Sequence, residues 1–406
     1  MPLGHSGKML ISELMSYIND YCGRDFRDIL EMVNSTGYIV SLKFSPGLKK
    51  EFLLIGENLK AKGINIKYIL SKEYEFLDNN LDSMVFLTKS TNLKEMLVDT
   101  FKFFSSKKIN ELFSEDNVKF ILFYNNHILN RPLAKFLKIK FKNVITILYF
   151  HDPYKPDKSS YGLSKGLYIS LAEFIVKRSL QFIDHVILAS KYGYELFSKY
   201  YNNYWGGVHI APLLVPSITL NNKHNREFFS IVGAYHSATG HDCFIRLVNY
   251  IAEKEGNYKF ALITSSNISE LLVNLSEAGK KIIKIVNRKI INDSEINQII
   301  AGSYAIFRLD KEVTQSGVIP VSYMNGTPII ARDIPGLTQH VQHGHTGYIV
   351  PFQCNSIDLT HAMNHVINNF NHLSINARNN YEEIWAEHNF DKYYRWLLET
   401  INCQQN

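Results

Sequence analysis

A short polar stretch between two apolar runs carries the residue types best suited to binding a phosphate group. An apolar run at Tyr304–Leu309 precedes it, the stretch itself is Thr314-Gln315-Ser316-Gly317, and a mostly apolar segment of helix length follows. A hydroxyl at Thr314 or Ser316 can cap that helix, and the free N–H groups of its first turn form an anion site. Gly317 lets the backbone approach a ligand closely.

His151 is the first candidate for acid–base chemistry. It directly follows the apolar run Val144–Phe150, and Asp152 comes next. Ligands of open α/β sheets bind at the carboxyl ends of strands, where His151 would lie. A histidine beside an acid can act as a base or as a hydrogen-bond donor. A structural histidine is the alternative, and Asp152 need not touch His151, because adjacent strand residues face opposite ways.

Charged residues also precede the phosphate-binding stretch. Arg308 and Lys311 would add positive charge near a phosphate, and Glu312 lies two residues before Thr314. The alternative for Glu312 is a solvated loop carboxylate.

Two glycine-containing turns follow other predicted strands. Ser45-Pro46-Gly47 comes after Tyr38–Phe44, where it is either a ligand-binding loop or only a tight turn. The second turn contributes Gly233, His236 and Gly240 after the apolar run Phe228–Gly233.

Apolar runs that alternate with amphipathic segments position these residues. The first clear unit is a strand at Tyr38–Phe44, a helix at Leu48–Lys62 closed by Gly63, and a strand at Ile64–Leu70. Further strands are predicted at 84–88, 119–124, 144–150, 186–189, 208–211, 228–233, 260–264, 282–286, 304–309, 329–332 and 348–350. Helices are predicted at 93–112, 133–140, 167–182 and 243–253. The fold class is therefore α/β, with parallel sheets covered on both faces.

The chain of 406 residues is long enough for two domains. Residues 1–36 predict a helical extension, with helices at 8–21 and 25–34, and 37–212 predicts the first domain. The run Pro212–Arg226, rich in Pro, Asn and Ser, predicts a linker. Residues 227–378 predict the second domain, and 379–406 predicts closing helices.

Composition narrows the classes of partner. The net charge of +6 is concentrated in residues 1–210, which hold 28 Lys and Arg against 21 Asp and Glu. A basic half can face anionic lipid headgroups or phosphorylated acceptors, and a solubilising surface is the alternative. We expect no nucleic-acid partner, because no dense basic run or binding motif occurs.

The cysteines and apolar runs predict a cytoplasmic protein. Four scattered cysteines (Cys22, Cys243, Cys354, Cys403) lack metal-ligand spacing, which predicts reduced thiols. No run is long enough to span a membrane, and no signal peptide is recognised. No Asp-x-Asp motif occurs, and the spacing of His343 and His345 matches no known zinc site, so we expect no metal or other cofactor.

The block Tyr304–Val350 resembles the C-terminal signature of family 4 retaining glycosyltransferases. The resemblance rests on the TQSG loop, the strand Gly326-Thr327-Pro328-Ile329-Ile330-Ala331 and the ending Gly347-Tyr348-Ile349-Val350. It implies two Rossmann-like domains facing a central cleft, the GT-B fold, with the last helices crossing back to the first domain. It also implies a nucleotide-sugar donor, retention of configuration and no metal.

The resemblance implies roles for the candidate residues. Glu312 stands for the first glutamate of the family's paired motif, which contacts the donor sugar, and His151 would face the cleft. Ser45–Gly47 and Asp152 would line that cleft in an acceptor domain. The acceptor would be a glycan or a lipid-linked intermediate, in surface polysaccharide or glycoconjugate synthesis at the inner face of a membrane.

Three positions depart from the family pattern. Val321 replaces the second glutamate, and Ala234 and Thr239 replace the Arg and Lys that clamp the diphosphate. The missing cations would cost several kcal/mol unless His236, His241 or Arg308 compensates, since charge-assisted hydrogen bonds are the strong ones. A non-catalytic subunit that binds a partner glycosyltransferase or a glycan is therefore one alternative, and another GT-B enzyme such as a sugar epimerase is a second.

Overall fold

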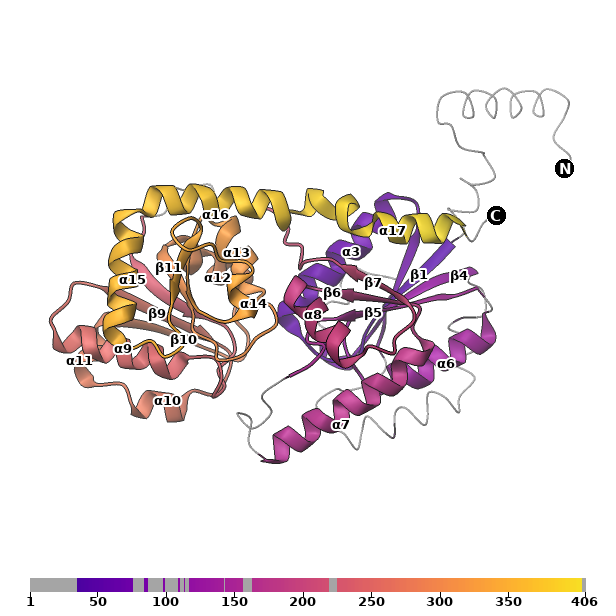
Figure 1. Cartoon of the computed structure of the whole chain (residues 1–406), viewed down its shortest axis with the longest axis horizontal. Helices are drawn as coiled ribbons and strands as arrows, with labels where there is room; N and C mark the ends of the chain where they lie inside the picture. The colour runs from indigo at the N-terminus through magenta and orange to yellow at the C-terminus, as the bar shows by residue number, and fades with distance from the viewer. Residues whose placement is uncertain are drawn as a thin grey trace, which may run out of the picture. The chain divides into compact units, whose positions relative to one another are not determined.

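The computed structural model describes residues 35–75, 84–86, 98, 109, 113, 117–141, 143–155, 163–218 and 225–403. The two predicted N-terminal helices lie outside these residues, as does nearly all of the predicted helix over 93–112. The chain divides into two compact units (Figure 1). The first comprises the described residues up to Tyr149, Arg178–Val186 and the chain from Tyr394 onward, and the second comprises Phe150–Lys177 and Ile187–Tyr393. The predicted domain ranges stay a prediction.

A seven-stranded sheet has the order β3-β2-β1-β4-β5-β6-β7. Its strands are β1 (Ser35–Ser41), β2 (Asn65–Leu70), β3 (Met84–Phe86), β4 (Asn117–Phe123), β5 (Ile145–Phe150), β6 (His185–Leu188) and β7 (Gly207–Ile210). β1 pairs in parallel with β2 and β4, β2 with β3, and β4 with β5. Every residue of β5 is buried, as expected for a parallel strand with both faces covered.

A six-stranded sheet has the order β10-β9-β8-β11-β12-β13, and all its pairs are parallel. Its strands are β8 (Phe228–Val232), β9 (Lys259–Thr264), β10 (Ile283–Asn287), β11 (Ser303–Arg308), β12 (Ile329–Arg332) and β13 (Gly347–Val350). The predicted α/β class with two parallel, Rossmann-like sheets is confirmed.

Helices connect the strands. They are η1 (Pro46–Leu48), α3 (Lys49–Ala61), α6 (Asn130–Lys140), α7 (Leu163–Ser179), η4 (Leu180–Phe182), α8 (Lys191–Tyr200), α9 (His241–Glu253), α10 (Ser269–Val273), α11 (Glu277–Ile282), α12 (Asp293–Ala301), α13 (Val318–Met324), α14 (Pro335–Thr338), α15 (Ser356–Asn368), α16 (Phe370–Ile384), η5 (Glu387–Asn389) and α17 (Phe390–Cys403). α17 begins in the second unit and ends in the first.

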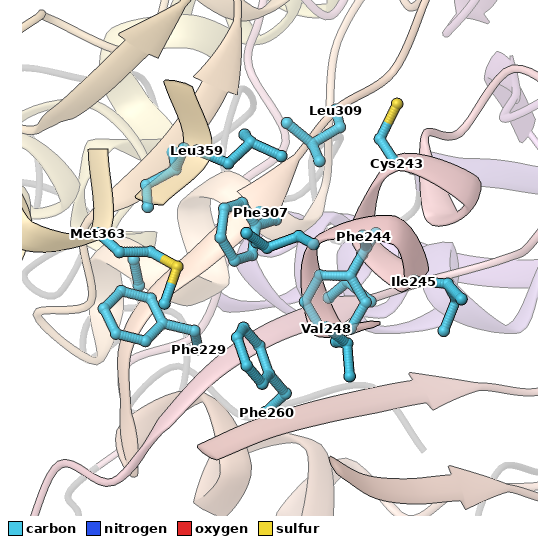
Figure 2. Packing of buried hydrophobic residues seen from close by; sticks show 14 of the residues in the cluster. Phe229, Cys243, Phe244, Ile245, Val248, Phe260, Phe307, Leu309, Leu359 and Met363 are labelled. Carbon is cyan, nitrogen blue, oxygen red and sulfur yellow. The ribbon is translucent and has the colours of Figure 1, made fainter. Parts of the chain in front are cut away.

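The core of the second unit follows from the alternation of side chains along its strands. On one face of the sheet, Phe244 of α9 packs edge-on against Phe260 and Phe307, with ring centroids 5.7 and 5.5 Å away (Figure 2). On the other face, Ala261 and Ile263 join a second buried cluster with residues of α12, α13 and α16. The strands of this sheet read as apolar runs in the sequence because both of their faces are buried.

A buried carboxyl group ties α3 to the core of the first unit. Tyr124 donates its hydroxyl hydrogen to Glu51 Oε2, and Tyr149 also hydrogen-bonds Glu51. Burial, and after it the charge of Glu51, raises the pKa of Tyr394 on α17. Hydroxyl donors are what a buried carboxylate needs, since each unsatisfied polar group in a core costs free energy.

We expect Glu51→Ala to lower the free energy of unfolding by about 2–4 kcal/mol, because two buried tyrosine hydroxyls lose their acceptor. Urea unfolding followed by circular dichroism measures the change. Glu57→Ala is the matched control, since Glu57 is exposed on the same helix beside Lys60 and should change stability by less than about 0.5 kcal/mol. Equal losses in both variants would contradict the role of Glu51.

Candidate functional site

The second sheet changes its winding direction between β8 and β11. β8 pairs with β9 on one side and β11 on the other, so the connections from these neighbouring strands leave in opposite directions. Such a switch point leaves a crevice outside the carboxyl ends of the two strands. Gly233 follows β8 there, and Arg308 is the last residue of β11.

Two glycines shape the loop from β8 to α9. Gly233 and Gly240 have φ angles of +127° and +72°, a region that residues with a Cβ rarely adopt. A Cβ on Gly240 would also lie 2.2 Å from the carbonyl oxygen of Leu309. At Gly233 a Cβ would lie 3.5 Å from Arg308 Nη1 and 4.0 Å from Val318 of α13. The loop therefore lies directly against the residues that follow β11.

Arg332 and Asp310 are buried at this edge, and Arg308 is partly buried, with 12% of its side chain exposed. Arg308 Nη1 donates to the carbonyl oxygen of Val232 at 3.2 Å, and its Nη2 forms an ion pair with Asp310 at 2.9 Å. Arg332, the last residue of β12, is 3% exposed, and its Nη2 donates to the sulfur of Cys243 at 3.2 Å. The Nε atoms of both arginines are buried without a hydrogen-bond partner.

The charges of this cluster do not cancel. Burial raises the pKa of Asp310, while the charges of Arg308 and Arg332 oppose that rise, so both guanidinium groups act on the same carboxylate. One carboxylate thus faces two cations, of which Arg332 is buried and Arg308 is partly buried. A buried charge is costly unless it is paired, so the cluster has capacity for a further anion.

His241 opens α9 beside this cluster and is 1% exposed. Its Nδ1 shares a hydrogen bond of 2.8 Å with the hydroxyl of Thr239, and its Nε2 is buried without a partner. Burial first, then the positive charge of Arg308, lowers its pKa to about 4, so the imidazole is neutral near pH 7. The Thr239 hydroxyl donates its hydrogen to the carbonyl oxygen of His236 at 2.7 Å, so His241 Nδ1 donates to Thr239 and the neutral ring presents Nε2 as an acceptor.

The loop before α13 is held by its main chain. The N–H of Lys311 donates to the carbonyl oxygen of Ala238 at 2.8 Å, and its Nζ donates to that of Ser237 at 3.1 Å. A Cβ on Gly336 would lie 1.7 Å from the carbonyl oxygen of Val313, so only glycine permits this contact. His236 Nδ1 accepts from the N–H of Ala238 at 3.3 Å and helps to form the facing turn.

The predicted helix cap is wrong. α13 begins at Val318 with Gly317 as its N-cap, and no side chain caps it, because glycine has none to offer. The hydroxyl of Thr314 bonds elsewhere, and the buried hydroxyl of Ser316 has no partner. Gln315 is half-buried, and a Cβ on Gly317 would meet only Leu213, at 3.6 Å.

Thr314 joins His151, Asp152 and Ser190, all within the second unit. Its hydroxyl donates to the carbonyl oxygen of His151 at 3.2 Å and to the carboxylate of Asp152. Its own carbonyl oxygen accepts from the Ser190 hydroxyl at 3.0 Å and from Gln339 Nε2 at 2.9 Å. The two predicted candidates, His151 and the TQSG loop, therefore come together through the hydroxyl of Thr314 and the main chain of His151.

Glu312 lies near Tyr192 of α8. It raises the pKa of Tyr192, after the larger effect of burial. Tyr192 is fixed by its N–H, which donates to Gln339 Oε1 at 3.0 Å.

The predicted loop Ser45-Pro46-Gly47 belongs to the first unit. The N–H of Ser45 donates to the hydroxyl of Tyr74 at 2.8 Å, and a Cβ on Gly47 would meet nothing within 4 Å. Whether this loop lines a cleft stays a prediction.

The first sheet has its own switch point, between β1 and β4. There Asn125 Nδ2 donates to the Ser41 hydroxyl and to the carbonyl oxygen of Lys43, both at 3.0 Å. The Ser71 hydroxyl and His127 Nε2 are buried without partners. These neutral groups suit a ligand rich in hydroxyl groups.

Sequence reasoning missed Asp310 and Arg332 as site residues. Arg332 ends an apolar strand and Asp310 follows one, so their position at strand ends was the available signal. Val321, at the place of the family's second glutamate, lies in α13 and packs against the core.

The two histidines set aside in the sequence lie on the surface. His343 and His345 are exposed, and His343 Nδ1 accepts from the N–H of Ile349. Among the described residues, no three His, Cys, Asp or Glu side chains gather as metal ligands would. In the same part of the chain, no helix combines the length and apolar character needed to cross a membrane.

The sequence matches no protein-family model and no curated protein, but the fold matches solved structures. A sucrose-phosphate synthase from Thermosynechococcus elongatus is 16% identical, with a TM-score of 0.70 over 90% of this chain and 99% of that chain. Anabaena HepE, solved with UDP-glucose, is 14% identical, with a TM-score of 0.67 over 90% of this chain and 99% of its own.

The pneumococcal O-GlcNAc transferase GtfA, solved with UDP and GlcNAc, is also similar. It is 10% identical, with a TM-score of 0.66 over 91% of this chain and 99% of its own. At these identities the likeness concerns the fold, which is that of GT-B glycosyltransferases with two Rossmann-like domains.

The lowered pKa of His241 predicts a loss of stability in acid. The unfolded chain takes up a proton at this histidine near pH 6.5, whereas the folded chain does so only near pH 4. Stability from this group is therefore complete above pH 6.5 and falls as the pH drops toward 4. We expect His241→Asn to reduce that slope by up to ~1.4 kcal/mol per pH unit. Urea unfolding at pH 4.5 and 6.5 measures it, and an unchanged slope would contradict the assignment.

Proposed function

We propose that this chain is a glycosyltransferase that moves a sugar from a nucleotide-sugar donor to a glycan or lipid-linked acceptor. The observation that carries the proposal is the buried surplus of positive charge at the switch point of the second sheet. Arg308 and Arg332 exceed Asp310 by one charge there, and the Nε atoms of both arginines lack hydrogen-bond partners. A diphosphate supplies the anionic oxygens that such a site needs.

Arg308 takes the place of the missing clamp in this proposal. The family pattern expects its cations after β8, where this chain has Ala234 and Thr239. Arg308 comes from β11, but its guanidinium reaches the carbonyl oxygen of Val232 at the end of β8. Gly233 leaves room beside it for a ligand to approach the backbone. The helix dipole of α9 adds to the positive potential.

The donor is a UDP-sugar in the first instance, because HepE and GtfA were solved with UDP compounds. Transfer proceeds with retention of configuration, with His151 and Glu312 beside the reacting sugar. The first sheet takes the acceptor, since the neutral polar groups around Asn125 suit hydroxyl groups. Protein groups alone hold the diphosphate, so no metal is required.

The setting of the reaction follows from the charge and the cysteines. The protein works in the cytoplasm, peripherally at the inner face of a membrane, in polysaccharide or glycoconjugate synthesis. The excess of Lys and Arg in residues 1–210 supports attraction to anionic lipids.

A non-catalytic subunit that binds a partner glycosyltransferase or a glycan is the second candidate. Ala234, Thr239 and Val321 favour it, because each replaces a group that contacts the donor in the resembling family. Such a subunit would bind neither the nucleotide nor its sugar.

Arg308→Met should weaken the binding of UDP-glucose by about 10–100-fold, the worth of a charge-assisted hydrogen bond. The double variant Arg308→Met with Asp310→Asn keeps the net charge of the cluster at +1, because Arg332 remains. The same loss is expected, since the variant still lacks the guanidinium of Arg308. Calorimetric titration measures the affinity of the two variants and of the wild type for UDP-glucose, first in EDTA and then with Mn²⁺. Each protein should bind with the same affinity in the two conditions, because no metal is required. The control is Arg288→Met, since Arg288 pairs with Glu295 on the surface.

Tight binding by the double variant would place the diphosphate elsewhere. No binding of UDP-, GDP-, ADP- or dTDP-sugars by the wild type would favour the non-catalytic subunit.

His151→Ala should slow the reaction by about 100-fold or more and change nucleotide affinity by less than twofold. The hydrogen bond from Thr314 reaches the main chain of His151, so the variant keeps it. Release of UDP and free sugar from UDP-glucose measures the rate without an acceptor, and NMR of the first anomer released reports retention. His388→Ala, at an exposed position, is the control. Full activity of His151→Ala would make this a structural histidine.

A further inference from the structure

The segment from α8 to β7 is unusually rich in aromatic residues. Residues 191–205 contain Tyr192, Tyr194, Phe197, Tyr200, Tyr201, Tyr204 and Trp205. Only part of this set serves the core. Phe197 and Tyr201 are buried against Phe150, with ring centroids 6.2 and 5.7 Å away, and the hydroxyl of Tyr201 donates to the carbonyl oxygen of Pro153 at 2.8 Å.

The remaining aromatic rings lie at the surface. Trp205 is 96% exposed in the turn after α8, where Tyr204 packs edge-on against Phe197 and holds the turn in place. Half-buried Tyr200 stacks on Tyr154 with ring centroids 3.5 Å apart and an interplanar angle of 15°. The exposed ring of Trp205 therefore offers a large aromatic face on which a ligand can pack.

The helix α8 connects the TQSG loop to these aromatic residues. The first turn of α8 is tied to that loop, because Ser190 caps the helix and also donates to the carbonyl oxygen of Thr314. Ten helical residues then carry the chain about 15 Å to Tyr200. Tyr192 lies near Glu312 at the N-terminal end of α8, and Trp205 follows the C-terminal end of α8.

We propose that Tyr154, Tyr200 and Trp205 form an aromatic track that binds a saccharide chain of the acceptor. Sugar rings have an apolar face of C–H groups that packs on an aromatic ring, and their hydroxyl edges need amide partners. Asn202 and Asn203 are exposed between Tyr200 and Trp205 and supply such amides.

The same surface is poorly suited to a lipid bilayer. The exposed charged residues of α8 are Lys191, Glu195 and Lys199, so cations and an anion alternate there. A membrane surface would favour cations with several aliphatic side chains. The track rests on the proposed transfer reaction and narrows its acceptor to an oligosaccharide or polysaccharide.

A glycan array that carries the same sugars as monosaccharides and as longer oligosaccharides tests the track. The wild type should bind oligosaccharides more strongly than monosaccharides. Trp205→Ala and Tyr200→Ala should each lose at least tenfold of the oligosaccharide signal. Phe174→Ala is the matched control, since Phe174 is an exposed aromatic residue on α7 and its loss should change nothing.

The outcomes separate the track from the proposed reaction. UDP-glucose titrations of the Trp205 and Tyr200 variants should match the wild type, because neither residue belongs to the arginine cluster. The track is overturned if the wild type shows no dependence on chain length, or if Trp205→Ala binds oligosaccharides fully. It is also overturned if Trp205→Ala instead loses binding to phosphatidylglycerol vesicles. Glycan binding without any binding or cleavage of nucleotide sugars would keep the track and reject the transfer reaction.

Discussion

The buried surplus of positive charge at the carboxyl edge of the second sheet is the constraint around which that unit is arranged. Two guanidinium groups in a site shielded from water are tolerable only when acceptors surround them. Asp310 supplies one charge, and the carbonyl oxygen of Val232 and the sulfur of Cys243 supply weaker partners. The cluster keeps a net positive charge, which lowers the stability of the unliganded protein and favours the binding of an anion.

Close backbone contacts keep this edge rigid enough to maintain the imbalance. Gly240 lies against the carbonyl oxygen of Leu309, and Gly336 lies against that of Val313, so each loop is fixed by a neighbouring main chain. Leu309 belongs to the apolar cluster under the sheet together with Phe244 and Phe307 (Figure 2). The position of Arg308 is therefore set by the packing of β11, not by a flexible surface loop.

The strands were predictable because parallel strands are apolar on both faces. Ile329–Arg332 was predicted with its observed bounds, and the other described strands were found within about three residues. Side-chain partners were not predictable. The sequence offered Thr314 and Ser316 as caps for α13, but Thr314 bonds to His151 and Asp152, which lie some 160 positions away in the chain. Nothing local encodes such a contact, nor the pairing of Arg332 with Cys243.

The departures from the family motif and the likeness of fold have one physical explanation. A diphosphate responds to the place of a positive charge, not to the strand that supplies it. In the donor site proposed above, Arg308 at the end of β11 acts at nearly the same point as a cation in the loop after β8 would, because these strands are neighbours in the sheet. A motif defined by spacing along the chain does not recognise a site whose cation lies on the other strand. The proposed site also depends on Gly233 and Gly240 beside Ala234 and Thr239, since the backbone must approach the ligand there.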